Sequence, residues 1–432
     1  MESGVLNQVL VGDVRQTLPT LPAGLFHCAM TSPPYWNLRS YLKSDDPMKH
    51  LEIGSERTPD EFVATMVDVF RHVKRVLRDD GVLWVNLGDG YNANGRFGRS
   101  TLSEKQGSNY GSVAAGDVMR CDVSGLRDGD QLLMPHRVAM AMQADGWILR
   151  STIIWAKKSP MPESVHGWRW IEGPDGYKLR RGKWRPTTAH EYVFMFSKSE
   201  RYFCDGDAIQ EPCSPNTHSR GDNRRSKGGT AGVERNNDSF NAACAGEVAT
   251  RNPRSVWSLS SEPYKGAHFA TFPTELAKRC IEAATSSAGC CPTCGMCYAP
   301  IVVSERVPTR PGTDSKVIGA MNAESPYMDH TAIGNRDPQR HVAVSRITGY
   351  APSCSCFATA PSQPCSVLDP FGGSGTVGQV ARQLGRDYVL CELNNDYLPL
   401  IEARIKATPR WAIPQKNARK RKRDSVSLLF DE

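Results

Sequence analysis

Short apolar runs that stop at proline, glycine or acidic residues recur along the chain and predict buried strands. Three of them, Val9–Val11, Leu25–Met30 and Val82–Leu87, lie early in the sequence. Between the last two runs, residues 59–78 carry apolar side chains at helical spacing, which predicts an amphipathic helix closed by Gly81. A strand, a helix and a second strand in this order are typical of a parallel α/β sheet.

The same alternation of strands and helices returns further along the chain. Each predicted element again combines an apolar run or a helical period with turn residues at its ends. We expect helices at 135–144, 274–284 and 377–384, and strands at 147–155, 192–196 and 387–391, with one more that starts at Ser366. Together these elements predict a mostly parallel central sheet that is interrupted by insertions.

Polar stretches separate these elements and divide the chain. Residues 90–130 are rich in Gly, Ser, Asn and Arg, have little periodicity, and predict a long surface loop. In residues 160–250, tryptophans alternate with arginines and lysines, a composition suited to phosphate and base-edge contacts but also to a solvated loop. Composition and periodicity set boundaries at 1–159, 160–250, 251–289, 290–357, 358–407 and 408–432.

The overall composition describes a globular chain without a membrane segment. Of the 432 residues, 39% are hydrophobic and 23% are charged, and no apolar run approaches the length that a bilayer requires. The N-terminus lacks the basic and apolar regions of a signal peptide, so we expect a cytoplasmic protein and no membrane partner. The net charge of +7 permits a polyanionic partner without proving one.

Close pairs of cysteines predict a metal site, because disulfides are rare in a reducing compartment. Cys291 and Cys294 form a CxxCG sequence, and Cys354 and Cys356 offer a second pair further on. Four thiolates would hold zinc in a structural role, since they leave no open position for a substrate. The alternatives are free thiols in a loop, or a ligand set that includes Cys290 or Cys297.

A Pro-Pro turn follows the second predicted strand. Neither Pro33 nor Pro34 can donate to a strand ladder, so the chain turns at the strand's carboxyl end, where open α/β sheets place their ligand clefts. The Ser32 hydroxyl and the Pro33 carbonyl would accept hydrogen bonds from the exocyclic amine of a flat base, and Tyr35 and Trp36 would stack on it. The alternative is a proline-rich loop whose aromatic side chains pack on the core.

A glycine turn joins a strand to a helix near the end of the chain. In the segment Asp369–Thr376, Gly373 and Gly375 allow close approach of the backbone to a ligand, which the N–H groups of the helix start would face. The next predicted strand ends at Glu392, where an acidic residue suits a ribose hydroxyl, and Asp13 follows the first strand. The combination predicts an adenosine-containing cofactor, while the lack of a Gly-Lys-Ser or Gly-Lys-Thr sequence argues against a triphosphate.

These two segments resemble motifs of the amino-group DNA methyltransferases. Ser32-Pro33-Pro34-Tyr35 is similar to their catalytic motif, Asp369 to Gly375 is similar to their cofactor loop, and their order along the chain is that of the β class. These enzymes transfer a methyl group from S-adenosylmethionine to N4 of cytosine or N6 of adenine. The resemblance implies a Rossmann-like fold, double-stranded DNA as substrate, a bacterial or phage-infected host cell, and a cognate restriction endonuclease as a candidate partner.

The resemblance also implies roles for individual residues. The catalytic residues would be Ser32, Pro33, Pro34 and Tyr35. The cofactor would contact Asp13, Phe272, Pro273, Asp369, Phe371, Gly372, Gly373, Ser374, Gly375, Thr376 and Glu392, with Asp13 on the adenine amine. Residues 268–273 read His-Phe-Ala-Thr-Phe-Pro, where the family often has His-Pro-Thr-Gln-Lys-Pro.

Each segment of the chain receives a role in this scheme. Residues 1–159 would be the catalytic half and 358–407 the half that binds S-adenosylmethionine, with a cofactor-side helix in 251–289. Residues 160–250 would form the target recognition region, and 290–357 would be a zinc-knuckle insertion, which is not a core feature of the family. The basic tail, 408–432, is expected to be disordered.

The residue before Pro-Pro-Tyr favours one target base. Adenine enzymes of this family mostly carry Asp or Asn there and cytosine-N4 enzymes mostly carry Ser, so Ser32 favours N4 of cytosine, methylated by direct in-line attack after base flipping. An adenine-N6 enzyme and a catalytically silent zinc-containing DNA-binding protein are the alternatives. Pro364-Cys365 precedes the glycine loop, which is the wrong order for C5-cytosine enzymes.

Overall fold

The chain forms two compact units. The structure, a computed structural model, describes residues 4–38, 40–43, 45–92, 123, 125–127, 129–160, 167–174, 176–182, 186–212, 218–220, 244–247, 250–262, 271–308, 341–356 and 361–410. The first unit comprises Met1–Ala208, Arg254–Tyr298 and Pro352–Gln415. The second comprises Ile209–Pro253, Ala299–Ala351 and Lys416–Glu432.

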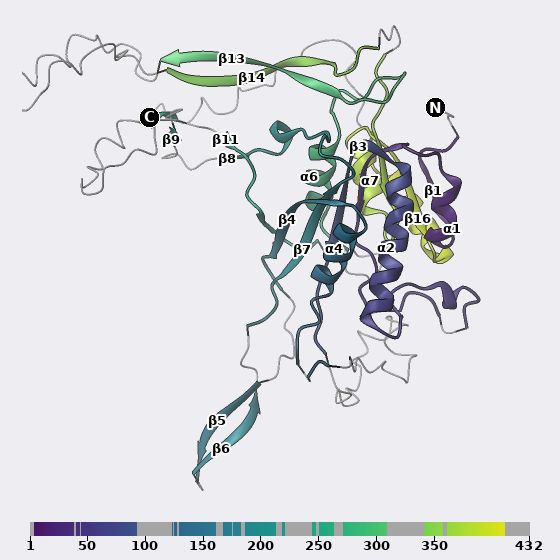
Figure 1. Ribbon diagram of the computed structural model, residues 1–432, viewed down its shortest axis with the longest axis vertical. Coiled ribbons are helices and arrows are strands. Elements are labelled where there is room, and N and C mark those ends of the chain that lie inside the picture. Colours follow the sequence, from purple (N-terminus) through teal and green to yellow (C-terminus); the bar gives the residue numbers. More distant parts are fainter. Residues whose placement is uncertain are drawn as a thin grey trace, which may run out of the picture. The chain divides into compact units, whose positions relative to one another are not determined.

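Among the described residues, the first unit is built on one large sheet, of which Figure 1 labels β1, β16, β3, β7 and β4. Its eight strands follow the order β1-β16-β15-β2-β3-β7-β4-β12. Neighbouring strands from β1 to β3 are parallel, whereas β7 runs antiparallel to both β3 and β4. The predicted mostly parallel sheet is therefore confirmed, with one reversed strand. The strands are β1 Gln8–Val11, β2 Phe26–Thr31, β3 Leu77–Leu87, β4 Ile148–Lys157, β7 His190–Ser197, β12 Val256–Leu259, β15 Ser366–Asp369 and β16 Asp387–Glu392.

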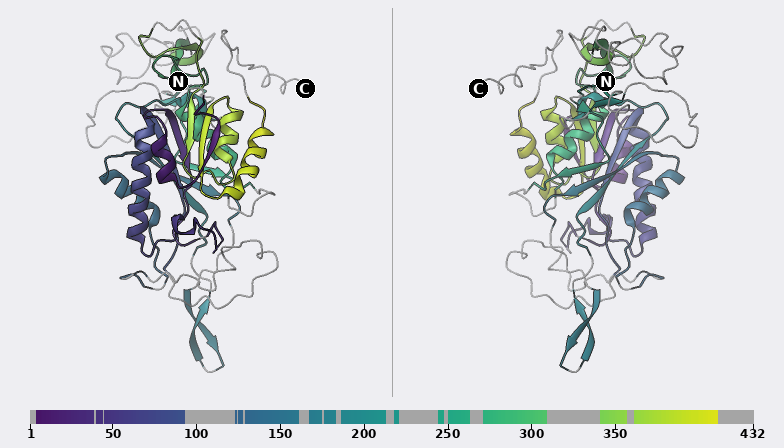
Figure 2. Two further views of the ribbon diagram at one scale, coloured as in Figure 1. Left: turned by 90° about the vertical axis from the view of Figure 1, so that its right-hand side faces the viewer. Right: turned by 90° about the vertical axis from the view of Figure 1, so that its left-hand side faces the viewer.

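Helices cover both faces of this sheet (Figure 2). Helices α2 and α4 pack against each other on one face, and α6, α7 and α8 form a second group. The α-helices are α1 Val14–Thr17, α2 Pro59–Val76, α4 Met134–Ala144, α6 Thr274–Ala284, α7 Thr376–Gln383 and α8 Leu398–Lys406. Short 3₁₀ helices are η1 Leu18–Thr20, η2 Lys49–Leu51, η4 Gly206–Ile209 and η7 Asn395–Tyr397.

Helix α2 shows how the apolar pattern becomes core. Thr58 caps its N-terminus by accepting from the Glu61 N–H, and Pro59 occupies its first turn. Its fully buried side chains are Phe62, Met66, Val69, Phe70, Val73 and Val76. Because these side chains recur every three or four residues, they lie on the one face of the helix that packs on the sheet.

The predicted end of this helix is wrong. Helix α2 stops at Val76, and the chain enters β3 directly through Leu77, which has extended backbone angles (φ −76°, ψ 140°). No left-handed residue is needed for such an exit. Gly81 instead lies inside β3, where a Cβ atom would come within 2.8 Å of the Leu77 side chain.

The register of the parallel strands brings their carboxyl ends to one edge. Leu368 of β15 pairs with Ala29 of β2, and Val11 of β1 pairs with Glu392 of β16. The segments that follow β1, β2, β3, β15 and β16 therefore leave the sheet at the same edge. Since β7 runs in the opposite direction, its amino-terminal end lies at this edge as well.

Smaller sheets lie in the insertions. Strands β5 Gly167–Gly173 and β6 Gly176–Gly182 form an antiparallel hairpin within the predicted recognition segment. The other short pairs are β8 Glu211–Pro212 with β11 Thr250–Arg251, β9 His218–Arg220 with β10 Cys244–Glu247, and β13 Tyr298–Pro308 with β14 His341–Pro352.

Several predicted segments fall outside the described residues. These are most of the loop at 90–130, most of 213–249, residues 263–270, which include His268, and the basic tail from 411 onward. Within the described part of the chain, no helix combines the length and apolar character needed to cross a membrane.

Candidate active site

The two motifs singled out in the sequence follow adjacent strands. Ser32 begins the turn after β2, and the glycine loop follows β15, the strand that pairs with β2. The Thr31 hydroxyl donates a 2.7 Å hydrogen bond to Asp369 Oδ1 and so joins the two strand ends directly. Segments more than three hundred residues apart in the sequence therefore line one edge of the sheet.

The Pro-Pro turn is held tightly against the segment that precedes α2. Gly54, at φ 101°, lies so close that a Cβ atom there would be 3.2 Å from both the Pro34 side chain and the Tyr35 carbonyl. Trp36 is buried in the core and donates its ring N–H to the Glu56 carbonyl at 2.9 Å. Trp36 therefore packs inward, which leaves Tyr35 as the aromatic side chain of this turn at the sheet edge.

A network of polar side chains surrounds the Tyr35 hydroxyl. Tyr35 donates to Glu191 Oε2 at 2.7 Å. Asn86 Nδ2 donates to the same oxygen at 2.7 Å and lies 3.0 Å from Tyr35 Oη and 3.3 Å from Ser32 Oγ. Lys157 Nζ binds the other carboxylate oxygen, Oε1, at 2.5 Å. Burial and the neighbouring carboxylate raise the pKa of Tyr35 well above its usual value, so the side chain stays a phenol.

Three residues of this network, Asn86, Lys157 and Glu191, were not identified from the sequence. Each stands at a strand end: Asn86 near the end of β3, Lys157 at the end of β4, and Glu191 near the start of β7. Their meeting depends on the antiparallel pairing of β7 with β3 and β4, and hydrophobic periodicity carries no information on strand direction. A polar residue at the end of an apolar strand was the feature that could have identified Asn86 and Lys157.

The ring of Tyr35 lies against a glycine of the β3 loop. A Cβ atom at Gly88 would come within 2.7 Å of Tyr35 Cε2. The next residue, Asp89, accepts from the backbone N–H groups of Leu133 and Met134 and so caps the start of α4. Gly88 therefore leaves room for the Tyr35 ring, while Asp89 fixes the loop in place.

The glycine loop after β15 uses its glycines in different ways. At Gly375 (φ 77°) a Cβ atom would be 2.8 Å from Ile401, and at Gly372 it would be 3.1 Å from Leu390. At Gly373 (φ 51°) the nearest atom to such a Cβ is 3.9 Å away. Gly372 and Gly375 therefore allow close packing of α8 and β16, whereas Gly373 borders open space that a ligand could approach.

Glu392 closes the other side of this loop. Its Oε2 accepts from the Gly373 N–H at 2.7 Å, and its Oε1 accepts from the Asn394 N–H at 2.9 Å. Burial raises the pKa of Glu392 to about 7 despite these donors. A carboxylate has about four acceptor positions, and the backbone N–H of Leu393 is a third donor to this one, so capacity remains for a ribose hydroxyl.

Other predicted cofactor residues have internal partners. Asp369 is 1% exposed, accepts from Thr31 and from the Phe371 N–H, and has its pKa raised by burial to about 8. The hydroxyls of Ser374 and Thr376 lie 2.8 and 3.0 Å from an Arg404 guanidinium nitrogen. Asp369 and Arg404 thus hold the loop in shape, and Arg404 was not identified in the sequence.

Asp13, Phe272 and Pro273 lie in flanking segments. Asp13 accepts from the backbone and the guanidinium of Arg15 and caps α1, while β1 pairs with β16 and so places Asp13 at the same edge as Glu392. Phe272 is half-buried, and Pro273 is the N-cap of α6, a helix that packs against α7. Helix α7 begins at the glycine loop.

The four predicted metal-binding cysteines come together. The sulfur atoms of Cys291, Cys294, Cys354 and Cys356 all lie within 4.8 Å of one another. Backbone N–H groups of Cys294 and Thr293 lower the pKa of Cys291 to about 6, which favours its thiolate. Four thiolates at this separation suit a tetrahedral zinc ion.

The segments that carry these four cysteines, here called the cysteine knuckle, contact the central sheet at the amino-terminal ends of β2 and β3. His27 of β2 hydrogen-bonds the Gly295 carbonyl at 2.7 Å, and Arg78 of β3 donates to the Cys294 carbonyl at 2.9 Å. The cluster therefore lies at the edge opposite the Pro-Pro turn and takes no part in its chemistry. Cys290 and Cys297, the alternative ligands, pack with Cys365 in a separate buried cluster.

Comparisons with known proteins place these segments in one family. A family model described as DNA methylase matches residues 26–291 and 365–403, which include the Pro-Pro turn and the glycine loop. The chain is 30% identical to the Type II methyltransferase M.SmaI of Serratia marcescens over 92% of this chain and 90% of that relative. It is 32% identical to the Type II methyltransferase M.Cfr9I of Citrobacter freundii over 91% of this chain and 86% of that relative.

Among solved structures, the PvuII DNA methyltransferase (cytosine-N4-specific) is similar with a TM-score of 0.46 and 16% identity, over 92% of this chain and 85% of that one.

The interval 292–364, which the family model leaves unmatched, contains Cys294, Cys354 and Cys356. Most of the cysteine knuckle therefore lies outside the part of the chain that the family model matches. The extent of these matches shows that the chain belongs to the β-class amino DNA methyltransferases, the N4-cytosine and N6-adenine family that uses S-adenosylmethionine.

Proposed function

We propose that this DNA methyltransferase methylates N4 of cytosine in double-stranded DNA at a specific site. The observation that supports this is Ser32 in the turn after β2, beside the cofactor loop after β15. Adenine enzymes of the family mostly carry Asp or Asn at this position. Methylation of N6 of adenine is the second candidate, because the amines of the two bases have the same hydrogen-bonding groups.

Ser32 and the Pro33 carbonyl would activate the amine. The lone pair of an amine on an aromatic ring is delocalised, which makes the nitrogen a poor nucleophile. Two acceptors that bind its N–H groups shift the nitrogen toward a tetrahedral form with a localised lone pair. Tyr35 would stack on the flipped base and hold the amine in line for attack.

The glycine loop and Glu392 would hold the cofactor. When bound, S-adenosylmethionine supplies a methyl group on a sulfonium, which no group of the chain needs to activate covalently. Glu392 would accept from the ribose hydroxyls, and Gly373 would allow the backbone to approach. Asp13, Phe272 and Phe371 are proposed as contacts that flank the adenosine, and Asp369, Ser374 and Thr376 as residues that keep the loop in shape.

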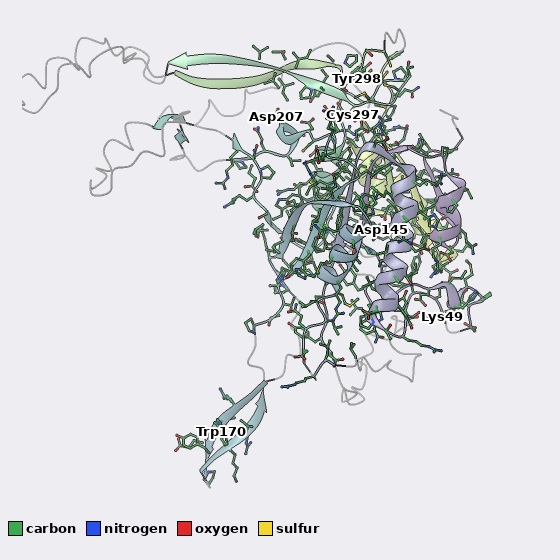
Figure 3. The ribbon with its side chains drawn as sticks, viewed as in Figure 1. Lys49, Asp145, Trp170, Asp207, Cys297 and Tyr298 are labelled. Atoms are coloured by element: carbon green, nitrogen blue, oxygen red, sulfur yellow. The ribbon has the colours of Figure 1, made fainter. Side chains whose placement is uncertain are left out.

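The β5–β6 hairpin is proposed as part of the target recognition region. Its register places Arg169 opposite Arg180 and Ile171 opposite Lys178, so three basic residues share one face. Trp170, on the other face, is 66% exposed and projects from the hairpin (Figure 3). A two-stranded ribbon of this kind fits the major groove of DNA.

The cysteine knuckle is proposed to hold one structural zinc ion. The four clustered sulfurs leave no position for a substrate, and the knuckle binds the sheet far from the proposed catalytic turn. Metal analysis of the purified protein should give about one zinc per chain by this ligand count. Replacement of Cys294 by Ser should lower that content, whereas replacement of the exposed Cys204 should not. A metal-free folded protein would contradict the proposal.

The target base can be identified directly. The purified protein is incubated with unmodified DNA and S-adenosylmethionine, and the DNA is digested to nucleosides for mass spectrometry. N4-methylcytosine is the expected product, N6-methyladenine would establish the second candidate, and 5-methylcytosine would contradict both. Ser32→Ala should abolish transfer but leave cofactor binding intact. Sequencing of the modified DNA would then identify the recognised site.

A further inference from the structure

We propose that Glu191 is a positioning residue that orients the hydroxyl hydrogens of Tyr35 and Ser32, so that Ser32 meets the target amine as an acceptor. The inference rests on the proposed role of Ser32. It concerns a residue that lies outside both sequence motifs and reaches the site from the reversed strand β7.

Strand pairing places the Glu191 carboxylate beside the Pro-Pro turn. In the ladder of β3 with β7, Leu87 pairs with Tyr192, so Glu191 lies one residue beyond the end of β3. In the ladder with β4, Glu191 pairs with Trp155, two residues before Lys157. The Glu191 side chain is 14% exposed and that of Lys157 is 26% exposed. A largely buried carboxylate is therefore paired with a cation while it faces the hydroxyls of the site.

The hydrogen-bonding capacity of each group then determines which group donates in each hydrogen bond of this network. An ionised carboxylate only accepts, so the Tyr35 hydroxyl must donate its single hydrogen to Glu191 across the 2.7 Å contact. The Tyr35 oxygen can then only accept from its other neighbours. Ser32 Oγ, at 3.3 Å, then donates its own hydrogen to Tyr35. Asn86 Nδ2 donates to one lone pair of Ser32 Oγ at 3.3 Å, which leaves the other lone pair for an N–H of the base.

The same carboxylate fixes the side-chain amide of Asn86. Asn86 Nδ2 donates to Glu191 at 2.7 Å, which prevents the amide from turning its oxygen toward the carboxylate. Asn86 is 1% exposed, and its Oδ1 has no hydrogen-bond partner among the described residues. A buried acceptor without a partner costs free energy unless a ligand or water satisfies it. The bond to Glu191 therefore determines that the nitrogen of this amide, and not its oxygen, faces Ser32.

The network also explains why a neutral isostere would fail. Lys157 needs an acceptor, so a glutamine at position 191 would turn its oxygen toward Lys157 and its NH₂ toward Tyr35. The Tyr35 hydroxyl would then accept from the amide and donate toward Ser32. Ser32 would then either lose its free lone pair or direct its own hydrogen at the amine nitrogen. In neither case could it accept a hydrogen bond from the amine, which is what activation requires.

The first test is Glu191→Gln, assayed by transfer of a labelled methyl group to DNA. We expect kcat to fall on the order of tenfold to a hundredfold, the effect of one to two misdirected hydrogen bonds, with little change in KM for DNA or in cofactor Kd. Asp145→Asn is the matched control, since Asp145 is also 14% exposed and is paired with a cation, Arg71, but lies at the C-terminus of α4, outside this network. A Glu191→Gln enzyme with the wild-type kcat would overturn the proposal.

The second test is Tyr35→Phe, alone and combined with Glu191→Gln. Phenylalanine keeps the ring and its packing but removes the hydroxyl that connects Glu191 to Ser32, so kcat should fall as in Glu191→Gln. The kcat of the double variant should be no lower than that of either single variant. Losses that multiply, or full activity of Tyr35→Phe, would overturn the proposal, because Glu191 would then not act through the Tyr35 hydroxyl. If Glu191→Gln has a far lower melting temperature than Asp145→Asn, the kcat of Tyr35→Phe alone still tests the proposal. The labelled methyl group reports transfer to either base, so an adenine product would overturn the cytosine assignment and still leave this test valid.

Discussion

The hydroxyl of Thr31 donates a 2.7 Å hydrogen bond to Oδ1 of Asp369, and this contact joins the end of β2, before the proposed catalytic turn, to the end of β15, before the proposed cofactor loop. Both residues are buried, Thr31 at 0% and Asp369 at 1% exposure. The reacting amine and the cofactor would be held by the two segments that follow this contact. In the proposed function, the relative placement of the two segments therefore depends on this buried hydrogen bond.

Removal of this contact should weaken the fold and the activity together. In Thr31→Val the shape of the side chain is kept, but Asp369 retains only the Phe371 N–H as a donor. We expect a loss of about 1 to 3 kcal/mol in the free energy of unfolding, the cost of a buried polar group without its partner. Denaturant unfolding measures the loss, and Thr20→Val, at an exposed hydroxyl near the surface, is the control. Equal stabilities of the two variants would contradict the structural role given to this bond.

The buried carboxyl of Asp369 should make stability fall as the pH rises. Burial raises its pKa to about 8 in the folded chain, whereas the unfolded chain has the ordinary value of about 4. Between these values the folded state binds a proton that the unfolded state has lost. The stabilisation is therefore complete below the unfolded pKa and disappears as the pH rises through the folded one, at up to about 1.4 kcal/mol per pH unit.

Asp369→Asn should remove this part of the pH dependence. The measurement is a series of urea unfolding curves of the cofactor-free protein between pH 5 and pH 9, compared with those of the wild type. Glu392, whose pKa burial raises to about 7, acts in the same direction and should leave a smaller slope in the variant. An identical slope in both proteins would show that Asp369 is ionised in the fold.

Two glycines of the cofactor loop should separate binding from folding. In Gly373→Ala the new Cβ atom lies 3.9 Å from the nearest protein atom, in the space that the cofactor would occupy, so we expect cofactor affinity to fall. The stability of the fold should fall only by the modest strain of a non-glycine residue with a left-handed backbone. Gly375→Ala puts its Cβ atom 2.8 Å from Ile401, so its melting temperature should fall further. Calorimetric titration with S-adenosylmethionine and thermal unfolding without it provide the two readouts. Wild-type affinity in Gly373→Ala and in the bulkier Gly373→Val would place the cofactor elsewhere.

Much of the fold was accessible from the sequence because buried strands and amphipathic helices leave a local periodicity. The bounds of α2, α4 and β16 follow that pattern within a few residues. The two motifs were recognisable because proline and glycine restrict or free the backbone in ways that few other residues can. Strand order and direction are properties of the assembled sheet, and so the meeting of Glu191 with Tyr35 was not accessible.

The glycine before Asp89 should control the position of Tyr35. In Gly88→Ala the new methyl group would come within 2.7 Å of the Tyr35 ring, so the ring must move and its hydroxyl must leave Glu191. We expect kcat to fall on the order of tenfold or more, with cofactor affinity unchanged, because a displaced group loses alignment with the reacting atoms. Gly90→Ala is the matched control, since its Cβ atom would meet Leu132 at an ordinary 3.4 Å.

The basic face of the β5–β6 hairpin should contribute to DNA affinity by binding phosphates. Arg169 and Arg180 lie opposite each other on that face, and Arg180 is exposed. Replacement of both by Ala should weaken binding to all sequences alike and reduce the slope of log affinity against log salt by about 2, or ~1 for each arginine that no longer neutralises a phosphate. Trp170→Ala, on the opposite face, should leave that slope unchanged because it removes no charge. Fluorescence anisotropy with a short duplex over a range of salt concentrations measures both effects. An unchanged slope in the double variant would show that the hairpin does not bind phosphates.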